Sequence, residues 1–245
     1  MALSGCVKKL VSLYGESFSS RLGINLKSGA SNEVFKWFLA SILFGARISE
    51  SIATNTYRNF EDNSVVIPEK ILETGWDGLV QILDEGGYVR YDFKTATKLL
   101  EIMKNLLKNY GDLNTLHDKA SNPRDLEQKL MNLGKGIGPV TVNIFLRELR
   151  GIWSKADPLP QKFEMLAAYN LGFTEVFGMS EAERFIALID LKNLWEKIKI
   201  SDKTFVEFEA ALVKYGRDYC YKGRCNKCEL IDFCKKRKIV KSRQS

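Results

Sequence analysis

The stretch that decides the fold reads Leu133-Gly134-Lys135-Gly136-Ile137-Gly138-Pro139-Val140-Thr141. It lies between one segment of helical apolar spacing that ends near residue 133 and another that begins near Pro139. Three glycines at alternate positions permit a sharp turn and bring backbone N–H groups close to an anion. Pro139 suits the first turn of the next helix, whose positive end would face the same anion. The stretch therefore predicts a phosphate-binding turn between two helices, although a plain tight connection between helices has the same pattern.

Apolar residues at helical spacing dominate the rest of the chain, whereas strand signals are weak because the β-branched run 65–67 stops at Pro68. Residues 33–44 are apolar almost all round, which is typical of a helix buried at the centre of a domain. We predict an all-α chain of roughly ten helices. The ranges predicted to be helical are 33–44, 94–109 with Gly111 at its C-cap, 123–133 with Asn122 as its N-cap, 140–150, 181–199 and 203–215.

The composition is that of a globular chain, since 45% of the 245 residues are hydrophobic and 27% are charged. The longest apolar stretch, 34–46, is interrupted by Lys36 and Ser41 and is too short to cross a bilayer. The N-terminus lacks the charged-then-apolar order of a secretory signal. We expect a cytoplasmic protein without a membrane partner, and a monomer.

The net charge of +7 is concentrated at the C-terminus. The last eleven residues, 235–245, hold six lysines and arginines and no acid, so they account for six of the seven net charges. A basic cluster of this kind is typical of proteins with a polyanion partner, most often nucleic acid. It is equally typical of a solvated tail that only aids solubility.

Four of the five cysteines follow the pattern Cys220-x4-Cys225-x2-Cys228-x5-Cys234, and Cys6 stands apart. Disulfides are not expected in a chain without a secretion signal. Four thiolates on a short loop can enclose one metal centre, either a zinc ion or an iron–sulfur cluster. Zinc sites commonly have two Cys-x2-Cys pairs and this run has one, so the pattern favours a cluster and leaves zinc as the alternative.

Asp157 is the carboxylate that the motifs single out for chemistry. It precedes Pro158 in the segment after the predicted helix 140–150, a position where an aspartate can also cap the next helix. Chemistry based on a histidine is hard to build, because His117 is the only histidine in the chain.

The order of these motifs resembles the helix-hairpin-helix DNA glycosylase superfamily, in particular its endonuclease III-like branch, which carries an iron–sulfur cluster. In that family the turn reads Leu-Pro-Gly-Val-Gly, an aspartate follows the next helix, and a four-cysteine loop closes the chain. Residues 134–138, Asp157 and 220–234 take these places here. The first gap between cysteines is shorter than in the family, with four residues. The resemblance covers about residues 30–234.

The resemblance implies two helical domains with DNA bound between them, and Asp157 at the mouth of the cleft. The implied ranges are 32–151 for a six-helix domain with the hairpin, 1–31 and 152–219 for a second helical domain, 220–234 for the cluster loop and 235–245 for a basic tail.

The resemblance also implies roles for individual residues. Ionised Asp157 would stabilise the sugar cation and activate water as the base leaves. Bifunctional members carry a lysine two residues after the last hairpin glycine, where this chain has Val140, which cannot form a Schiff base. Arg47 is equally typical of a surface charge, and aromatic residues such as Tyr88 and Tyr91 are more often core residues than wedges. The implied DNA contacts are Gly134, Lys135, Gly136, Ile137, Gly138, Val140 and Thr141 of the hairpin, Arg47 in the place of a gap-filling residue, and Tyr88 or Tyr91 in the place of a wedge.

Together these residues predict a monofunctional, nucleoid-associated DNA glycosylase that flips a damaged or mispaired base out of double-stranded DNA and hydrolyses its N-glycosidic bond. Besides a zinc-bound nucleic-acid module, two other functions fit the sequence. One is a bifunctional glycosylase and AP lyase with a relocated lysine, and the other is a non-catalytic DNA-binding protein in which Asp157 only caps a helix. A 4Fe–4S cluster would fix the loop that presents Lys222, Arg224 and Lys227 to phosphates.

Overall fold

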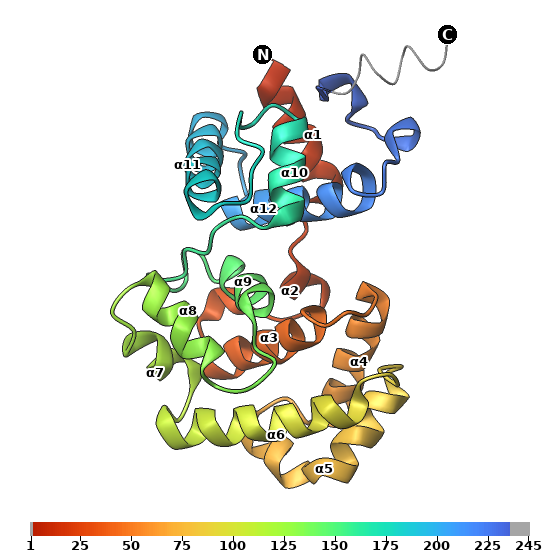
Figure 1. Ribbon diagram of the computed structural model, residues 1–245, viewed down its shortest axis with the longest axis vertical. Coiled ribbons are helices and arrows are strands. Elements are labelled where there is room, and N and C mark those ends of the chain that lie inside the picture. The colour runs from red at the N-terminus through yellow and green to blue at the C-terminus, as the bar shows by residue number, and fades with distance from the viewer. Residues whose placement is uncertain (1, 236–245) are drawn as a thin grey trace. The chain divides into compact units, whose positions relative to one another are not determined.

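The computed structural model describes residues 2–235, which fold into helices joined by turns (Figure 1). The predicted all-α fold is confirmed, because no β-strand occurs between residues 2 and 235. Within the same residues no helix is both long and apolar enough to cross a membrane. The basic tail predicted at 235–245 lies, apart from Lys235, outside the described residues.

The chain divides into two compact units. We call Ser19–Pro158 the hairpin unit, and Met1–Phe18 together with Leu159–Ser245 the terminal unit. The range 32–151, predicted as a six-helix domain, lies inside the hairpin unit. The helices of the hairpin unit are α3 (Ser31–Phe44), α4 (Glu50–Asp62), α5 (Pro68–Glu85), α6 (Asp92–Asn109), α7 (Leu113–Asp118), α8 (Pro123–Met131) and α9 (Pro139–Arg147), and the short α2 (Phe18–Arg21) spans its start.

Helix α3 is the buried centre of the hairpin unit. Trp37, Phe38 and Leu39 are each at most 1% exposed. The Trp37 indole also donates a hydrogen bond to the carbonyl of Phe145 in α9 at 3.1 Å, so the polar atom of this large side chain is satisfied in the core. Full burial of a side chain of this size contributes about 1.5–3 kcal/mol, which explains why an almost wholly apolar segment forms the central helix.

Two helices begin at the residues that the sequence predicts, and one helix ends earlier than predicted. The Asn122 side chain accepts a hydrogen bond from the Asp125 N–H at 3.0 Å and starts α8, and Pro139 is the first residue of α9. The helix predicted at 140–150 ends earlier, because the chain turns after Arg147 and the Trp153 N–H bonds to the Leu149 carbonyl at 2.9 Å.

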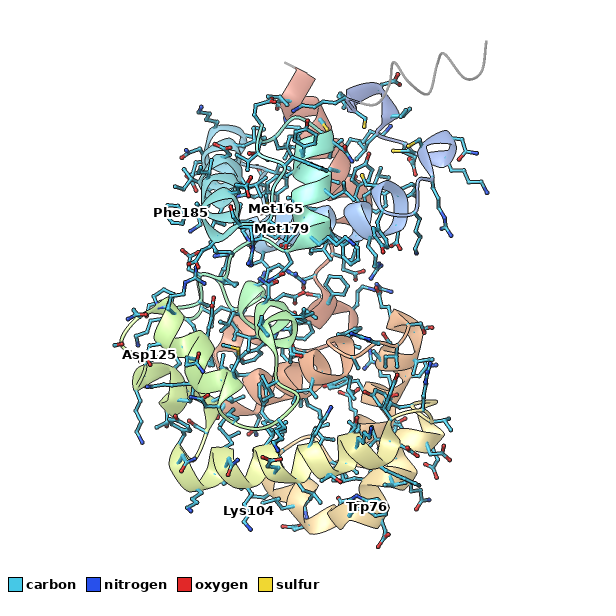
Figure 2. The ribbon with its side chains drawn as sticks, viewed as in Figure 1. Trp76, Lys104, Asp125, Met165, Met179 and Phe185 are labelled. Carbon is cyan, nitrogen blue, oxygen red and sulfur yellow. The ribbon has the colours of Figure 1, made fainter. Side chains whose placement is uncertain are left out.

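Some apolar side chains of the described structure remain at the surface. Trp76 follows a break in α5 at Gly75, where φ is +68°, and its indole donates to Thr97 Oγ1 at 3.1 Å (Figure 2). Phe185 lies on α11 (Glu181–Ile198) in the terminal unit and is 54% exposed (Figure 2).

The terminal unit packs the first helix of the chain against the last ones. Val7 and Leu10 of the first helix share a buried core with Phe208 and Leu212, and the Trp195 ring stacks on Phe208 at 5.5 Å. Its helices are α1 (Ala2–Tyr14), α10 (Lys162–Asn170), α11 (Glu181–Ile198) and α12 (Phe205–Tyr215), followed by single turns at Gly216–Cys220, Cys225–Lys227 and Ile231–Phe233.

Candidate active site and nucleic-acid interface

The glycine-rich hairpin between α8 and α9 is anchored by its apolar residues and exposes its glycine turn. Leu133 and Ile137 are 1% and 5% exposed, whereas Lys135 and Gly136 lie at the surface. Gly136 has a φ of +105°, which favours glycine over any residue with a side chain. Gly138 is the residue before α9, so the first N–H groups of that helix lie beside the turn. The hairpin therefore has the backbone geometry of an anion seat.

One face of α6 supports the hairpin, a feature that the sequence did not reveal. Asn105 donates from Nδ2 to the Leu133 carbonyl at 2.8 Å. A Cβ on Gly134 would lie 2.8 Å from Ile102 Cγ1, so only glycine permits this close approach. Lys98, one turn earlier on α6, lies along Gly136. Because residues at this spacing share one helix face, α6 fixes the hairpin along its length.

Lys98 brings a positive charge to the hairpin. A Cβ on Gly136 would lie 2.7 Å from Lys98 Cδ and 3.0 Å from its Nζ. No ion pair of Lys98 occurs among residues 2–235. The ammonium therefore lies beside the turn that exposes Lys135, and the two lysines give this surface a local positive potential.

The start of α9 interlocks with the end of α3. A Cβ on Gly45 would lie 2.2 Å from Thr141 Oγ1, so the helices meet where the chain leaves α3 for the segment with Arg47. Thr141 is 4% exposed and belongs to this contact, whereas its neighbour Val140 is 55% exposed in the first turn of α9. Arg47 lies at the surface. The structure thus brings two of the predicted DNA-contacting segments together, with Thr141 as a packing residue between them.

The loop between α5 and α6 differs from its predicted form. Tyr88 is 4% exposed and accepts a hydrogen bond from Thr95 Oγ1 at 3.3 Å, so its ring presents no face on which a base could stack. Tyr91 is half-buried, with the Arg90 guanidinium 5.4 Å from its ring centre. The apolar side chain exposed in this loop is Val89, at 62%. Turns at residues 86–87 and 89–91 bury one side chain of this loop and expose the next, which the sequence alone did not resolve.

Asp157 lies in an irregular segment and does not cap a helix. The next helix, α10, begins at Lys162, and Gln161 is its N-cap, so the capping interpretation of Asp157 is wrong. Its side chain is 40% exposed and is ion-paired with the guanidinium of Arg150, which is 7% exposed. Arg150 also donates to the carbonyl of Pro158. The arrangement presents a carboxylate at the surface and holds it from the buried side.

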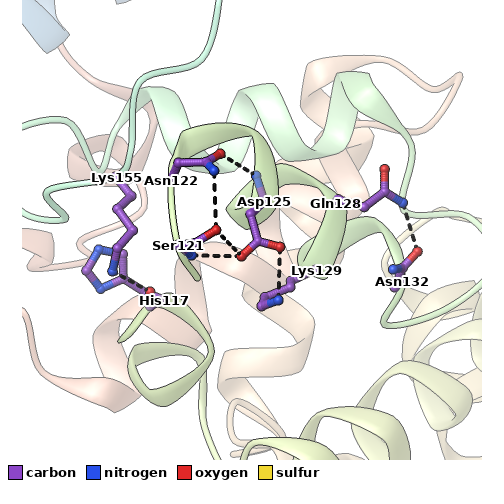
Figure 3. A network of polar contacts seen from close by, with 8 residues as sticks. All are labelled: His117, Ser121, Asn122, Asp125, Gln128, Lys129, Asn132 and Lys155. Atoms are coloured by element: carbon purple, nitrogen blue, oxygen red, sulfur yellow. Dashed lines mark hydrogen bonds and ion pairs between the residues drawn. The ribbon is translucent and has the colours of Figure 1, made fainter. Parts of the chain in front are cut away.

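The segment before Asp157 is fixed to α7 (Figure 3). The Trp153 ring stacks on His117 at 4.8 Å, and its indole donates to Asn114 Oδ1 at 2.9 Å. Lys155 Nζ donates to the His117 carbonyl at 2.9 Å. Burial, with the Lys155 charge, lowers the pKa of His117, so the imidazole is neutral near pH 7. His117 is therefore a structural residue of this segment.

Hydrogen bonds also define the start of α8, on the same side of the unit (Figure 3). The Asp125 carboxylate accepts from the Ser121 N–H at 2.7 Å and pairs with Lys129 at 2.9 Å. These contacts lower the pKa of Asp125 to about 2. The Asp125 carboxylate therefore stabilises the start of α8, whereas Asp157 caps no helix.

The four clustered cysteines line one cavity of about 40 Å³ in the terminal unit. Tyr215 OH lies 3.0 Å from Cys228 Sγ, and Lys9 of α1 donates to the Glu229 carbonyl at 2.7 Å, which ties the loop to the helical core. No three His, Cys, Asp or Glu side chains between residues 2 and 235 lie close enough together to hold a single metal ion. Four cysteine thiols around one cavity are donors that both zinc ions and iron–sulfur clusters take in proteins. The residues that line the cavity are Asn170, Tyr215, Tyr219, Cys220, Gly223, Cys225, Cys228, Ile231 and Cys234.

Comparison with known proteins identifies the fold. No family profile and no curated protein sequence matches this chain. Among solved structures, it is similar to the crystal structure of 3-methyladenine DNA glycosylase (MagIII) from H. pylori bound to 1,N6-ethenoadenine, with 13% sequence identity and a TM-score of 0.56. The similarity covers 91% of this chain and 99% of that chain. At this identity the likeness shows the fold alone: the chain shares the all-helical fold of that structure.

Proposed function

We propose that the protein is a DNA repair glycosylase that hydrolyses the N-glycosidic bond of a damaged or mispaired base. The observation that carries the proposal is Asp157: an exposed carboxylate that caps no helix, held by a buried arginine in the same unit as the glycine hairpin. A carboxylate with no capping role that stays ion-paired at the surface is suited to stabilising positive charge on a ligand.

The hairpin unit supplies the contacts to the DNA strand. Backbone N–H groups at Gly136, Gly138 and Val140 would hold a phosphate, with the charges of Lys98 and Lys135 beside it. These contacts position the strand without reading its sequence. A base in a duplex is out of reach, so the target nucleotide would be flipped out of the stack.

In the chemical step, positive charge grows on the sugar as the bond to the base breaks. The Asp157 carboxylate would stabilise this oxocarbenium-like state and orient the water that attacks the sugar carbon. Water supplies the hydroxyl group of the abasic sugar, the base leaves with the electron pair of the broken bond, and the proton that water loses balances the charge of the departing base.

The residues support a monofunctional enzyme. Val140 has no amine at the position of the family's lyase lysine. Lys155 is bonded to the His117 carbonyl, so this nearby lysine already has a structural role. Borohydride trapping tests this part directly: we expect no covalent protein–DNA complex, and a trapped complex would favour a glycosylase and lyase with a relocated lysine.

We assign the cavity of the four cysteines to a 4Fe–4S cluster, with zinc as the alternative. Cys220, Cys225, Cys228 and Cys234 would be its ligands. When bound, such a group supplies structural cross-linking of the loop, and Lys222, Arg224 and Lys227 would then face phosphates. Anaerobic purification followed by visible absorption and metal analysis distinguishes the two, because iron–sulfur clusters are coloured and zinc is not.

The decisive experiment is base release from a panel of duplexes that each contain one lesion, scored for strand breaks before and after alkali. The panel includes 1,N6-ethenoadenine and 3-methyladenine, the adenine derivatives named with the structural neighbour. We expect breaks only after alkali, and a loss of about a hundredfold in rate for Asp157→Asn. Asp77→Asn, an exposed carboxylate of the same unit, is the control. Equal activity of Asp157→Asn and wild type would reject Asp157, and DNA binding without base release from any duplex would favour a non-catalytic binding protein.

A further inference from the structure

We infer that Arg150 is the positioning residue of the reaction: it orients the Asp157 carboxylate during base release. This inference rests on the proposed function. Its starting point is an asymmetry of exposure, because the arginine is 7% exposed and the aspartate 40%. The partly exposed carboxylate is thus held by a guanidinium group that is almost fully buried.

The guanidinium makes two different contacts with neighbouring residues. One nitrogen donates to the Asp157 carboxylate, and the other donates to the carbonyl of Pro158. A guanidinium is rigid, planar and charged at every working pH, so the two bonds fix the side chain of one residue relative to the backbone of the next.

The position of Arg150 is itself set by packed residues. Arg150 follows Leu149, which is fully buried, and its backbone forms an isolated β-bridge with that of Trp153. Trp153 stacks on His117 of α7 and also contacts Phe145 of α9 edge-on at 5.4 Å. A continuous set of contacts therefore runs from the core through Arg150 to the carboxylate, and it includes the helix that follows the hairpin. Catalytic groups lose rate when displaced by about 1 Å, so the contacts of Arg150 define where the carboxylate acts.

The prediction is a loss of rate without a loss of DNA affinity. Arg150→Met should reduce single-turnover base release by about tenfold to a hundredfold. Its binding to a duplex with an abasic site should remain within about twofold, because the hairpin contacts are untouched. Arg150→Lys keeps the charge but cannot make both bonds, so we expect a smaller loss of rate and a native melting temperature.

The experiment is a double-mutant cycle of Arg150→Met and Asp157→Asn, measured as single-turnover rates on the duplex that wild type processes fastest. If Arg150 acts through Asp157, Arg150→Met causes no further loss in the Asp157→Asn background. Arg58→Met is a matched control. Arg58, elsewhere in the unit, also donates hydrogen bonds to a carboxylate and to a backbone carbonyl, those of Glu61 and Arg21. We expect it to leave the rate unchanged.

Two results would overturn the inference. One is a wild-type rate in Arg150→Met and Arg150→Lys alike, and the other is an equal loss in both backgrounds of the cycle. If Arg150→Met does not fold, the Arg150→Lys cycle decides in the same way. Failure of the proposed function is separate, since wild type itself would then release no base from any duplex of the panel.

Discussion

Replacing Gly136 by alanine tests the hairpin geometry on which the proposed DNA binding depends. At a φ of +105° a side chain costs about 1–3 kcal/mol. The new Cβ would also lie 2.7 Å from Lys98 Cδ, although a lysine side chain can swing away at small cost. We therefore expect Gly136→Ala to lower the free energy of unfolding by about 1–3 kcal/mol, most of it from the backbone.

The same substitution should weaken DNA binding by about tenfold, because the turn can no longer present its N–H groups to a phosphate, and a hydrogen bond to a charged group contributes about 1.5–3 kcal/mol. Urea denaturation measures the change in the free energy of unfolding. Fluorescence anisotropy with a labelled duplex, at one fixed salt concentration, measures the change in DNA affinity.

Gly111→Ala is the matched control for this prediction. Gly111 has a φ of +81°, and a Cβ there would meet no atom within 4 Å. It should therefore lose comparable stability and bind DNA like wild type. The reasoning is refuted if both variants weaken DNA binding equally, or if Gly136→Ala binds DNA as wild type does while losing stability.

Three further predictions concern charge, pH and the cysteine cavity. Lys98→Met should weaken binding to all duplexes alike and reduce the slope of log affinity against log salt by about 0.9, which a salt titration measures; a loss confined to lesion-bearing DNA would contradict a phosphate contact. Asp125 is protonated only near pH 2 when folded, below its usual value of 3.8, so it stabilises the fold above pH 4 and this contribution disappears between pH 4 and pH 2. Asp125→Asn should thus flatten the fall of unfolding free energy in that window, and an unchanged pH profile would argue against it. Cys228→Ser should abolish visible absorption and bound iron and lower the melting temperature, whereas Cys6→Ser, which alters a cysteine outside the lining of the cavity, should retain the iron.

Much of the local structure was predictable because its signals lie within a few residues of one another. Asn122 with Pro123 and Gly138 with Pro139 start helices where the sequence indicates, since caps act on the next turn of the same chain. The central helix α3 followed from its apolar composition alone.

The contacts of the candidate site were less predictable because they join residues far apart in the sequence. Nothing near Gly136 indicates that Lys98 lies against it, and nothing near Asp157 distinguishes its partner Arg150 from other arginines. The burial of Tyr88 depends on Thr95 of another element. Asp157 was interpreted as a possible cap because Asp-Pro is a common start of a helix, but two apolar residues and Gln161 separate Pro158 from α10.

The interlocked contact of Gly45 with Thr141 has a mechanical consequence. Because no atom fits between them, the segment leading to Arg47 and the first turn of α9 must move as one body. The segment leading to Arg47 and the first turn of α9, both proposed to contact DNA, then keep a fixed distance from each other. If both parts contact DNA as proposed, a duplex that bends easily to that spacing would be bound more tightly than a stiff one.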